Sequence, residues 1–145
     1  MTKVYNRQYL NDWMFLGPGR ETTVYSLSLV MMDIRNFRKI NDAMGSVAGD
    51  RILIRVADIL QESARGSDSV IRYGGDEFLL IFLNCSKEQV KNRMSIIKER
   101  IGQILYGEDR GESVCVDFGI ASTEKFVQSP EFLEAMIKEA GELLC

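Results

Sequence analysis

Apolar residues recur along this chain at two spacings, one typical of helices and one typical of buried strands. Spacings of three and four residues predict amphipathic helices, whereas short apolar runs rich in β-branched residues predict strands inside a sheet. The expected helices span residues 6–14, 37–44, 51–64, 86–105 and 130–144. The expected strands span residues 24–32, 69–73, 77–83 and 113–121.

Capping residues mark several of the helix ends. The segment Gly17-Pro18-Gly19-Arg20 should end the first helix, and Gly45 should end the second as a C-terminal cap. Ser86 and Gln89 have the spacing of a capping box at the start of the fourth helix. Ser129 followed by Pro130 should open the last helix.

A glycine pair, Gly74-Gly75, separates two of the expected strands. Glycine pairs supply the positive φ angles of tight turns, so we expect an antiparallel hairpin with this pair at its tip. The element order is then α-β-α-α-β-β-α-β-α. It predicts an α+β, sandwich-like fold in which a mixed, mostly antiparallel central sheet is covered by helices.

Composition narrows the class of protein. The 145 residues suffice for one domain with a hydrophobic core, and the net charge of −3 leaves no broad basic surface for nucleic acid. The longest clean apolar run, residues 78–83, is too short to cross a bilayer, and the first residues do not resemble a signal peptide. We therefore expect a cytoplasmic domain, or the cytoplasmic part of a larger, membrane-anchored protein, that makes no membrane contact itself.

The chain contains no histidine, which excludes Ser-His and Cys-His catalysis and histidine metal sites. Its three cysteines, Cys85, Cys115 and Cys145, have no metal-ligand spacing and are expected to be reduced. Chemistry must then come from carboxylates, lysines, hydroxyls and a recruited metal ion.

Three acidic residues lie where strands are expected to end or turn. Asp33 follows the first strand, and Asp76 and Glu77 lie at the hairpin tip. If these strands are neighbours, the carboxylates converge and repel one another unless a divalent cation such as Mg²⁺ lies between them. Such a site would assist phosphoryl transfer. The alternative is that the acids are solvated or cap turns, as single acids at such places usually do.

Four segments of the chain resemble motifs of one known family, and the motifs occur in the same order in both. Residues 74–78 spell G-G-D-E-F, and residues 33–42 resemble the pattern D-x-D-x-F-K-x-I-N-D. Residues 45–50 resemble G-H-x-x-G-D, and residues 2–10 resemble the end of L-T-G-L-x-N-R. The chain thus resembles, over essentially its whole length, the GGDEF domain of bacterial diguanylate cyclases.

The resemblance implies a nucleotidyl-cyclase-like palm that condenses two GTP molecules into cyclic di-GMP and pyrophosphate, with Mg²⁺ or Mn²⁺ as cofactor. Each domain of a homodimer would present one GTP to a second GGDEF domain. Asp33, the Ile34 carbonyl and Asp76 would hold metal, and Asp76 and Glu77 would be catalytic. The substrate-binding residues implied in the same way are Phe37, Arg38, Asn41, Ser46, Asp50, Gly74 and Gly75.

Two of these assignments have plain structural alternatives. Asn41 and Asp50 would recognise guanine, since a carboxylate accepts from its N1–H and N2–H₂ donors, but an acid at position 50 also suits a helix N-terminus. Arg65 and Asp68 fall at the family's R-x-x-D site, where cyclic di-GMP binds and inhibits. Without the resemblance they would be read as a polar loop.

The chain also departs from the family pattern. Arg35 replaces the second acid of D-x-D, Ser46 replaces a histidine, and Arg38 replaces a lysine. Asp117 replaces a serine in a strand, where burial would raise its pKa or require a partner. The family's later A-K-x-x-G-R-N segment is not in residues 1–145, so we expect a single domain taken from a larger signalling protein. A degenerate sensor that binds GTP or cyclic di-GMP without turnover is the alternative function, and a plain interaction domain is a third.

Overall fold

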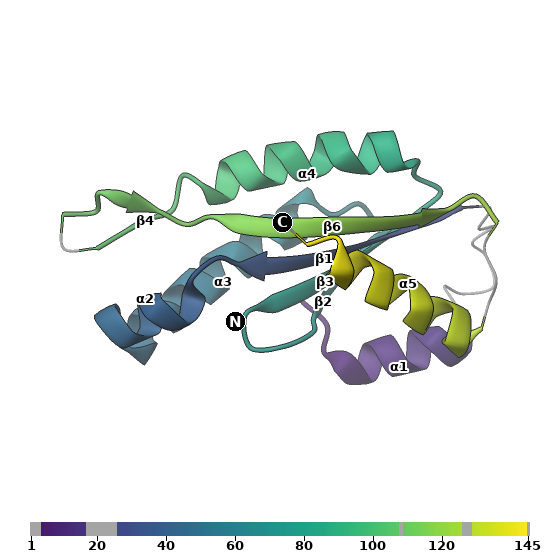
Figure 1. The fold of residues 1–145 in the computed structure, drawn as a ribbon, viewed down its shortest axis with the longest axis horizontal. Helices are drawn as coiled ribbons and strands as arrows, with labels where there is room; N and C mark the ends of the chain where they lie inside the picture. Colours follow the sequence, from purple (N-terminus) through teal and green to yellow (C-terminus); the bar gives the residue numbers. More distant parts are fainter. Residues whose placement is uncertain (1–3, 17–25, 108, 126–128, 145) are drawn as a thin grey trace.

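A four-stranded antiparallel sheet forms the centre of the protein (Figure 1). The computed structural model describes residues 4–16, 26–107, 109–125 and 129–144. The strand order is β2-β3-β1-β6, and every neighbouring pair is antiparallel. The strands are β1 (Leu27–Ile34), β2 (Ser69–Arg72), β3 (Glu77–Leu83) and β6 (Val116–Thr123). An isolated parallel bridge joins Tyr5 to Ile71 at the β2 edge.

Helices cover both faces of this sheet (Figure 1). On one face lie α1 (Arg7–Leu16) and α5 (Pro130–Glu142), and on the other lie α3 (Ser46–Ser63) and α4 (Lys87–Ile101). The short α2 (Phe37–Met44) connects β1 to α3. The predicted α+β class is confirmed. None of the helices in the described ranges is long and apolar enough to span a membrane.

The central strand β1 is buried on both faces, which explains its unbroken apolar sequence. Val30 and Met32 pack against α3 and α4, whereas Leu29 and Met31 pack against α1 and α5. Two separate hydrophobic cores therefore hold β1 between them. The strand extends to Ile34, so that Asp33 lies inside it. The predicted start at residue 24 and the breaker at 17–20 lie outside the described residues.

The predicted caps are confirmed where the structure describes them. Ser86 and Gln89 form the capping box, with backbone-to-side-chain distances of 3.2 and 2.9 Å. The Ser129 hydroxyl accepts from the Phe132 N–H at 3.4 Å at the start of α5. Gly45 has φ 90°, a conformation that favours glycine, and separates α2 from α3.

Two predicted helix boundaries are wrong by a full turn or more, and one hairpin was not predicted. Helix α3 begins at Ser46 rather than at residue 51, because its first turn carries few core residues and leaves Val47 exposed. Helix α4 ends at Ile101, so Leu105 is not part of its core stripe and is 53% exposed. The segment before β6 forms a small hairpin of β4 (Leu105–Tyr106) and β5 (Glu112–Ser113). Strands of two residues carry no recognisable alternation, so the sequence pattern could not reveal them.

We expect Gly119→Ala to destabilise the protein. Gly119 lies on β6, and a Cβ there would come within 2.1 Å of the Ala140 carbonyl oxygen on α5. Overpacking of this kind typically costs about 1–3 kcal/mol. Urea unfolding should show the loss, while Gly66→Ala, whose Cβ would meet open space, should change stability by less than about 0.5 kcal/mol. Equal stability of the two variants would contradict this close contact between α5 and β6.

Candidate active site

Three acidic side chains form a row across one end of the sheet. In the strand register Asp33 on β1 lies opposite Glu77 on β3 and opposite Asp117 on β6. Residues directly opposite on antiparallel strands point to the same face, here the face covered by α1 and α5. We call Glu77, Asp33 and Asp117 the acidic row. The structure thus places the predicted acids Asp33 and Glu77 side by side, and Asp117 is a third acid in the same row.

The hairpin tip adds a fourth carboxylate beside Asp33. The Ile34 N–H donates to the Asp76 carbonyl at 3.2 Å, which ties the tip to the end of β1. Burial raises the pKa of Asp33 to about 7, helped by a hydrogen bond to Asp76 and by the charges of Asp76, Glu77 and Asp117. One Asp33 oxygen, Oδ1, is buried without a hydrogen-bond partner. Asp33 is therefore surrounded by negative charge, and its buried oxygen has no positively charged partner.

The oxygen donors at this end of the sheet fit a divalent cation that takes only some of its ligands from the protein. Within the described ranges no group of three or more His, Cys, Asp or Glu side chains is arranged to hold a metal ion alone. Mg²⁺, however, commonly takes only one or two carboxylates and completes its shell with waters and phosphates. Asp33, Asp76 and the Ile34 carbonyl are oxygen donors of that kind, and the unpaired Asp33 Oδ1 supplies the free ligand position.

The glycines at the hairpin tip act differently from the prediction. Neither Gly74 nor Gly75 has a positive φ angle, so the turn does not require glycine for its backbone conformation. A Cβ on Gly74 would come within 2.6 Å of Glu77 Oε1, so the glycine leaves room for the present position of this carboxylate. A Cβ on Gly75 would meet nothing within 4 Å, so this position leaves open space beside the acids.

Arg72 fixes the tip, a role that the sequence analysis missed. Its Nη2 donates to the Gly75 carbonyl at 2.8 Å, and its Nε donates to the Gly74 carbonyl at 3.4 Å. Arg72 also lines a pocket of about 360 Å³ between the sheet and α3. Its position two residues before the glycine pair is the one sequence signal that could have indicated this role.

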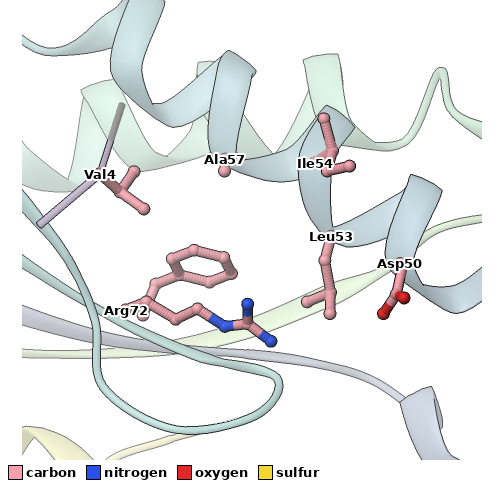
Figure 2. A pocket seen from close by; sticks show the side chains of 7 residues that line it. Val4, Asp50, Leu53, Ile54, Ala57 and Arg72 are labelled. Atoms are coloured by element: carbon pink, nitrogen blue, oxygen red, sulfur yellow. The ribbon is translucent and has the colours of Figure 1, made fainter. Parts of the chain in front are cut away.

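Figure 2 shows this pocket, with Asp50, Leu53, Ile54 and Ala57 along one helix and Arg72 across from them. Asn41 packs against α3 at Gly49. The approach is so close that a Cβ on Gly49 would lie only 1.7 Å from the Asn41 Oδ1. This oxygen is also buried without a hydrogen-bond partner. The structure therefore places Asn41 against Gly49, the residue that precedes Asp50, with a polar atom of Asn41 unsatisfied.

The other predicted substrate residues lie around the same end of the sheet. Phe37 opens α2 and approaches the same point of α3, since its ring would be 3.2 Å from a Cβ on Gly49. Arg38 and Ser46 are exposed, in the first turns of α2 and α3. Of these three, Phe37 is the one in contact with the Asn41 region.

A second pocket, of about 590 Å³, opens beside the acidic row on the α1 and α5 face. Glu77 lines it together with two basic side chains, Arg7 and Lys138. The Arg7 guanidinium lies 4.3 Å from the centre of the Tyr73 ring. No local sequence pattern indicates these two basic residues, because they come from helices at opposite ends of the chain.

Arg65 and Asp68 occupy a loop between α3 and β2, and the structure gives them different surroundings. The Asp68 side chain is only 3% exposed, and its Oδ2 pairs with Arg93 Nη2 at 2.8 Å. The same oxygen accepts from the Arg65 N–H at 2.8 Å. The Arg65 residue is exposed. Asp68 therefore shapes the loop, and Arg93 on α4 is a partner that the motif did not reveal.

We expect Asp33→Asn to stabilise the metal-free protein by about 1–2 kcal/mol at neutral pH, a value discounted for partial solvent screening. The folded pKa of about 7 lies above the ordinary value of 3.8, so ionisation of Asp33 costs stability that accumulates from about pH 4 to about pH 7. The gain should therefore grow over that range and then level off in urea unfolding. Mn²⁺ should stabilise the wild type and not the variant. Asp58→Asn, at an exposed position on α3, is the control, and an equal gain there would contradict the expectation.

Comparisons with known proteins identify the family of this chain. Residues 1–144 match the family described as "Diguanylate cyclase, GGDEF domain". Diguanylate cyclase DosC of Escherichia coli K12 is 30% identical over 145 residues, which cover 99% of this chain and 31% of DosC. Diguanylate cyclase A of Treponema denticola is 33% identical over 108 residues, covering 73% of this chain and 28% of that protein. The chain thus spans about a third of the length of these relatives.

Solved structures share the fold. The GGDEF domain of DgcB from Caulobacter crescentus, in complex with c-di-GMP, superposes with a TM-score of 0.80 at 22% identity, covering 97% of this chain and 83% of that one. The GGDEF domain of PA1120 from Pseudomonas aeruginosa gives 0.79 at 25% identity, covering 98% and 88%. With the family match over residues 1–144, these findings show that the chain belongs to the GGDEF family of diguanylate cyclases.

Proposed function

We propose that this domain condenses two GTP molecules into cyclic di-GMP and releases pyrophosphate, in the cytoplasm, where GTP is available. The observation that carries the proposal is the buried, unpaired Oδ1 of Asp33 beside Asp76 and Glu77. A carboxylate cluster of this kind needs a cation, and Mg²⁺ commonly binds to one or two carboxylates together with the phosphates of a substrate. Mg²⁺ or Mn²⁺ would neutralise the charge that develops on the transferred phosphoryl group.

The chain's own residues would then bind and orient the substrate. Asn41 and Asp50 offer acceptors to the N1–H and N2–H₂ groups of guanine, which adenine does not match. The open position at Gly75 leaves room for the phosphates next to the acids. Arg7 and Lys138, in the neighbouring pocket, supply positive charge for the distal phosphates.

The chemical step needs a second copy of the domain. The 3′-hydroxyl oxygen of one GTP forms a bond to the α-phosphorus of the other, and the bond from that phosphorus to the bridging oxygen breaks. Pyrophosphate leaves, and the hydroxyl proton passes to the Asp76 carboxylate, assisted by Glu77. Because each domain binds one GTP, a homodimer repeats the step from the opposite side and closes the ring.

Turnover by the full-length protein tests this function. Incubation with GTP and Mg²⁺ should yield cyclic di-GMP and pyrophosphate, measured by chromatography. Asp76→Asn should lower the rate at least about 100-fold, because it removes both a cation ligand and the proton acceptor. Asp58→Asn should keep the wild-type rate. Binding of GTP without product would instead support the non-catalytic sensor, and a lack of any thermal shift with GTP would contradict nucleotide binding altogether.

The loop of Arg65 and Asp68 is part of the proposal as a product-inhibition site. Arg65 is exposed and has a planar guanidinium that suits phosphate or guanine. We therefore expect Arg65→Ala to weaken inhibition by cyclic di-GMP about tenfold or more and to leave the stability of the fold unchanged. Asp68→Ala should lower stability by about 3–5 kcal/mol, because the mostly buried Arg93 loses its carboxylate partner and keeps only its hydrogen bond to the Ser63 carbonyl. Inhibition curves and urea unfolding of both variants separate the two roles. Unchanged inhibition of Arg65→Ala would contradict the assignment.

A further inference from the structure

Arg35 and Asp117, two positions that depart from the family pattern, form an ion pair with each other. Arg35 Nε donates to Asp117 Oδ2 at 3.2 Å, and Arg35 Nη2 pairs with Asp117 Oδ1. The Arg35 N–H also donates to the Cys115 carbonyl at 2.8 Å. Two parallel contacts between a guanidinium and a carboxylate are a strong and directional form of ion pair.

This pair lies at one end of the acidic row. Asp117 is directly opposite Asp33 in the register, where side chains on neighbouring strands have Cβ atoms about 4.5–5.5 Å apart. The charge of Asp117 is one of the causes that raise the pKa of Asp33. A like charge at this distance from a cation ligand affects both the ligand and the cation.

Arg35 changes what Asp117 contributes to the site. Its hydrogen bond is the largest cause that lowers the pKa of Asp117, with Lys98 adding a smaller favourable charge. Both Asp117 oxygens are directed to the guanidinium. The expectation that Asp117 requires a partner is met, and the partner is the other departure from the family pattern. Together the two side chains have no net charge.

We propose that Arg35 is a positioning residue that sets the cation affinity of the site. By holding Asp117, Arg35 removes one negative charge and one competing carboxylate from the acidic row, so that Asp33 and Asp76 determine where the cation binds. The inference rests on the proposed function, because it takes those two residues as the cation's ligands. If the ion pair only held β1 and β6 together, its loss would change the stability of the fold and not the cation affinity.

Charge-neutralising variants of nearly equal size distinguish these roles. Arg35→Gln frees the Asp117 charge and should tighten Mn²⁺ binding about three- to tenfold, whereas Asp117→Asn leaves Arg35 unbalanced and should weaken it by a similar factor. The double variant restores a neutral pair and should bind Mn²⁺ within about twofold of the wild type. Arg35→Lys keeps the charge and should also remain close to wild type.

The measurement is a titration of the full chain with Mn²⁺ alone, in which electron paramagnetic resonance counts the free ion. Arg100→Gln and Glu62→Gln, from an exposed pair between α3 and α4, change charge by the same amounts on the other face and should leave the affinity unchanged. Thermal unfolding of each variant confirms that it is folded. If an Arg35 single variant does not fold, the comparison of Asp117→Asn with the double variant still tests the sign.

The two proposals would fail in different ways. Suppose that the wild type binds Mn²⁺ and that both single variants shift the affinity in the same direction, or that neither shifts it. Arg35 then has only a structural role, and this inference is overturned. If the wild type binds no Mn²⁺ in the absence of nucleotide, the positioning role of Arg35 is overturned, and if it also forms no cyclic di-GMP from GTP, the proposed function falls as well.

Discussion

Repulsion among carboxylates is the constraint on which the active end of this domain depends. Asp33, Asp76, Glu77 and Asp117 meet because β1 lies between β3 and β6 and the hairpin tip folds over its end. The strands have no freedom to separate, since two hydrophobic cores hold β1 from both faces. Burial of apolar surface in the sheet thus stabilises an arrangement of charges that would be unfavourable by itself. The ion pair of Arg35 relieves one part of that repulsion, and a cation would relieve the rest.

Three glycines, which have no side chain, matter as much as the charged groups. Gly49 makes room for the Asn41 amide, Gly74 makes room for the Glu77 carboxylate, and Gly119 admits the end of α5 against β6. None of these three has a positive φ angle. Each glycine therefore serves close packing between elements rather than an unusual backbone conformation, and each lies next to a region that carries a proposed role.

The sequence predicted most elements because their local signals agree with their tertiary surroundings. Helix α2, strand β3 and the caps at Ser86 and Ser129 are of this kind. The β4–β5 hairpin was missed, because strands of two residues have no periodicity. The acids of the site were identified through strand ends and motif resemblance. The partners Arg93 and Arg72, and the pairing of Arg35 with Asp117, depend on side chains brought together by the fold, which no local pattern records.

The register of β1 with β6 also has a consequence for how the protein is made. Arg35 and Asp117 are 82 residues apart in the chain, and the acidic row, which includes Asp117, is complete only when β6 pairs with β1. Contacts of such high sequence separation form late, because long loops must close before they are stabilised. During synthesis β1 leaves the ribosome long before β6, so the nascent chain carries Asp33 without its final neighbours. Assembly of the charged centre and completion of the sheet are therefore one event, and partly made chains lack the finished site.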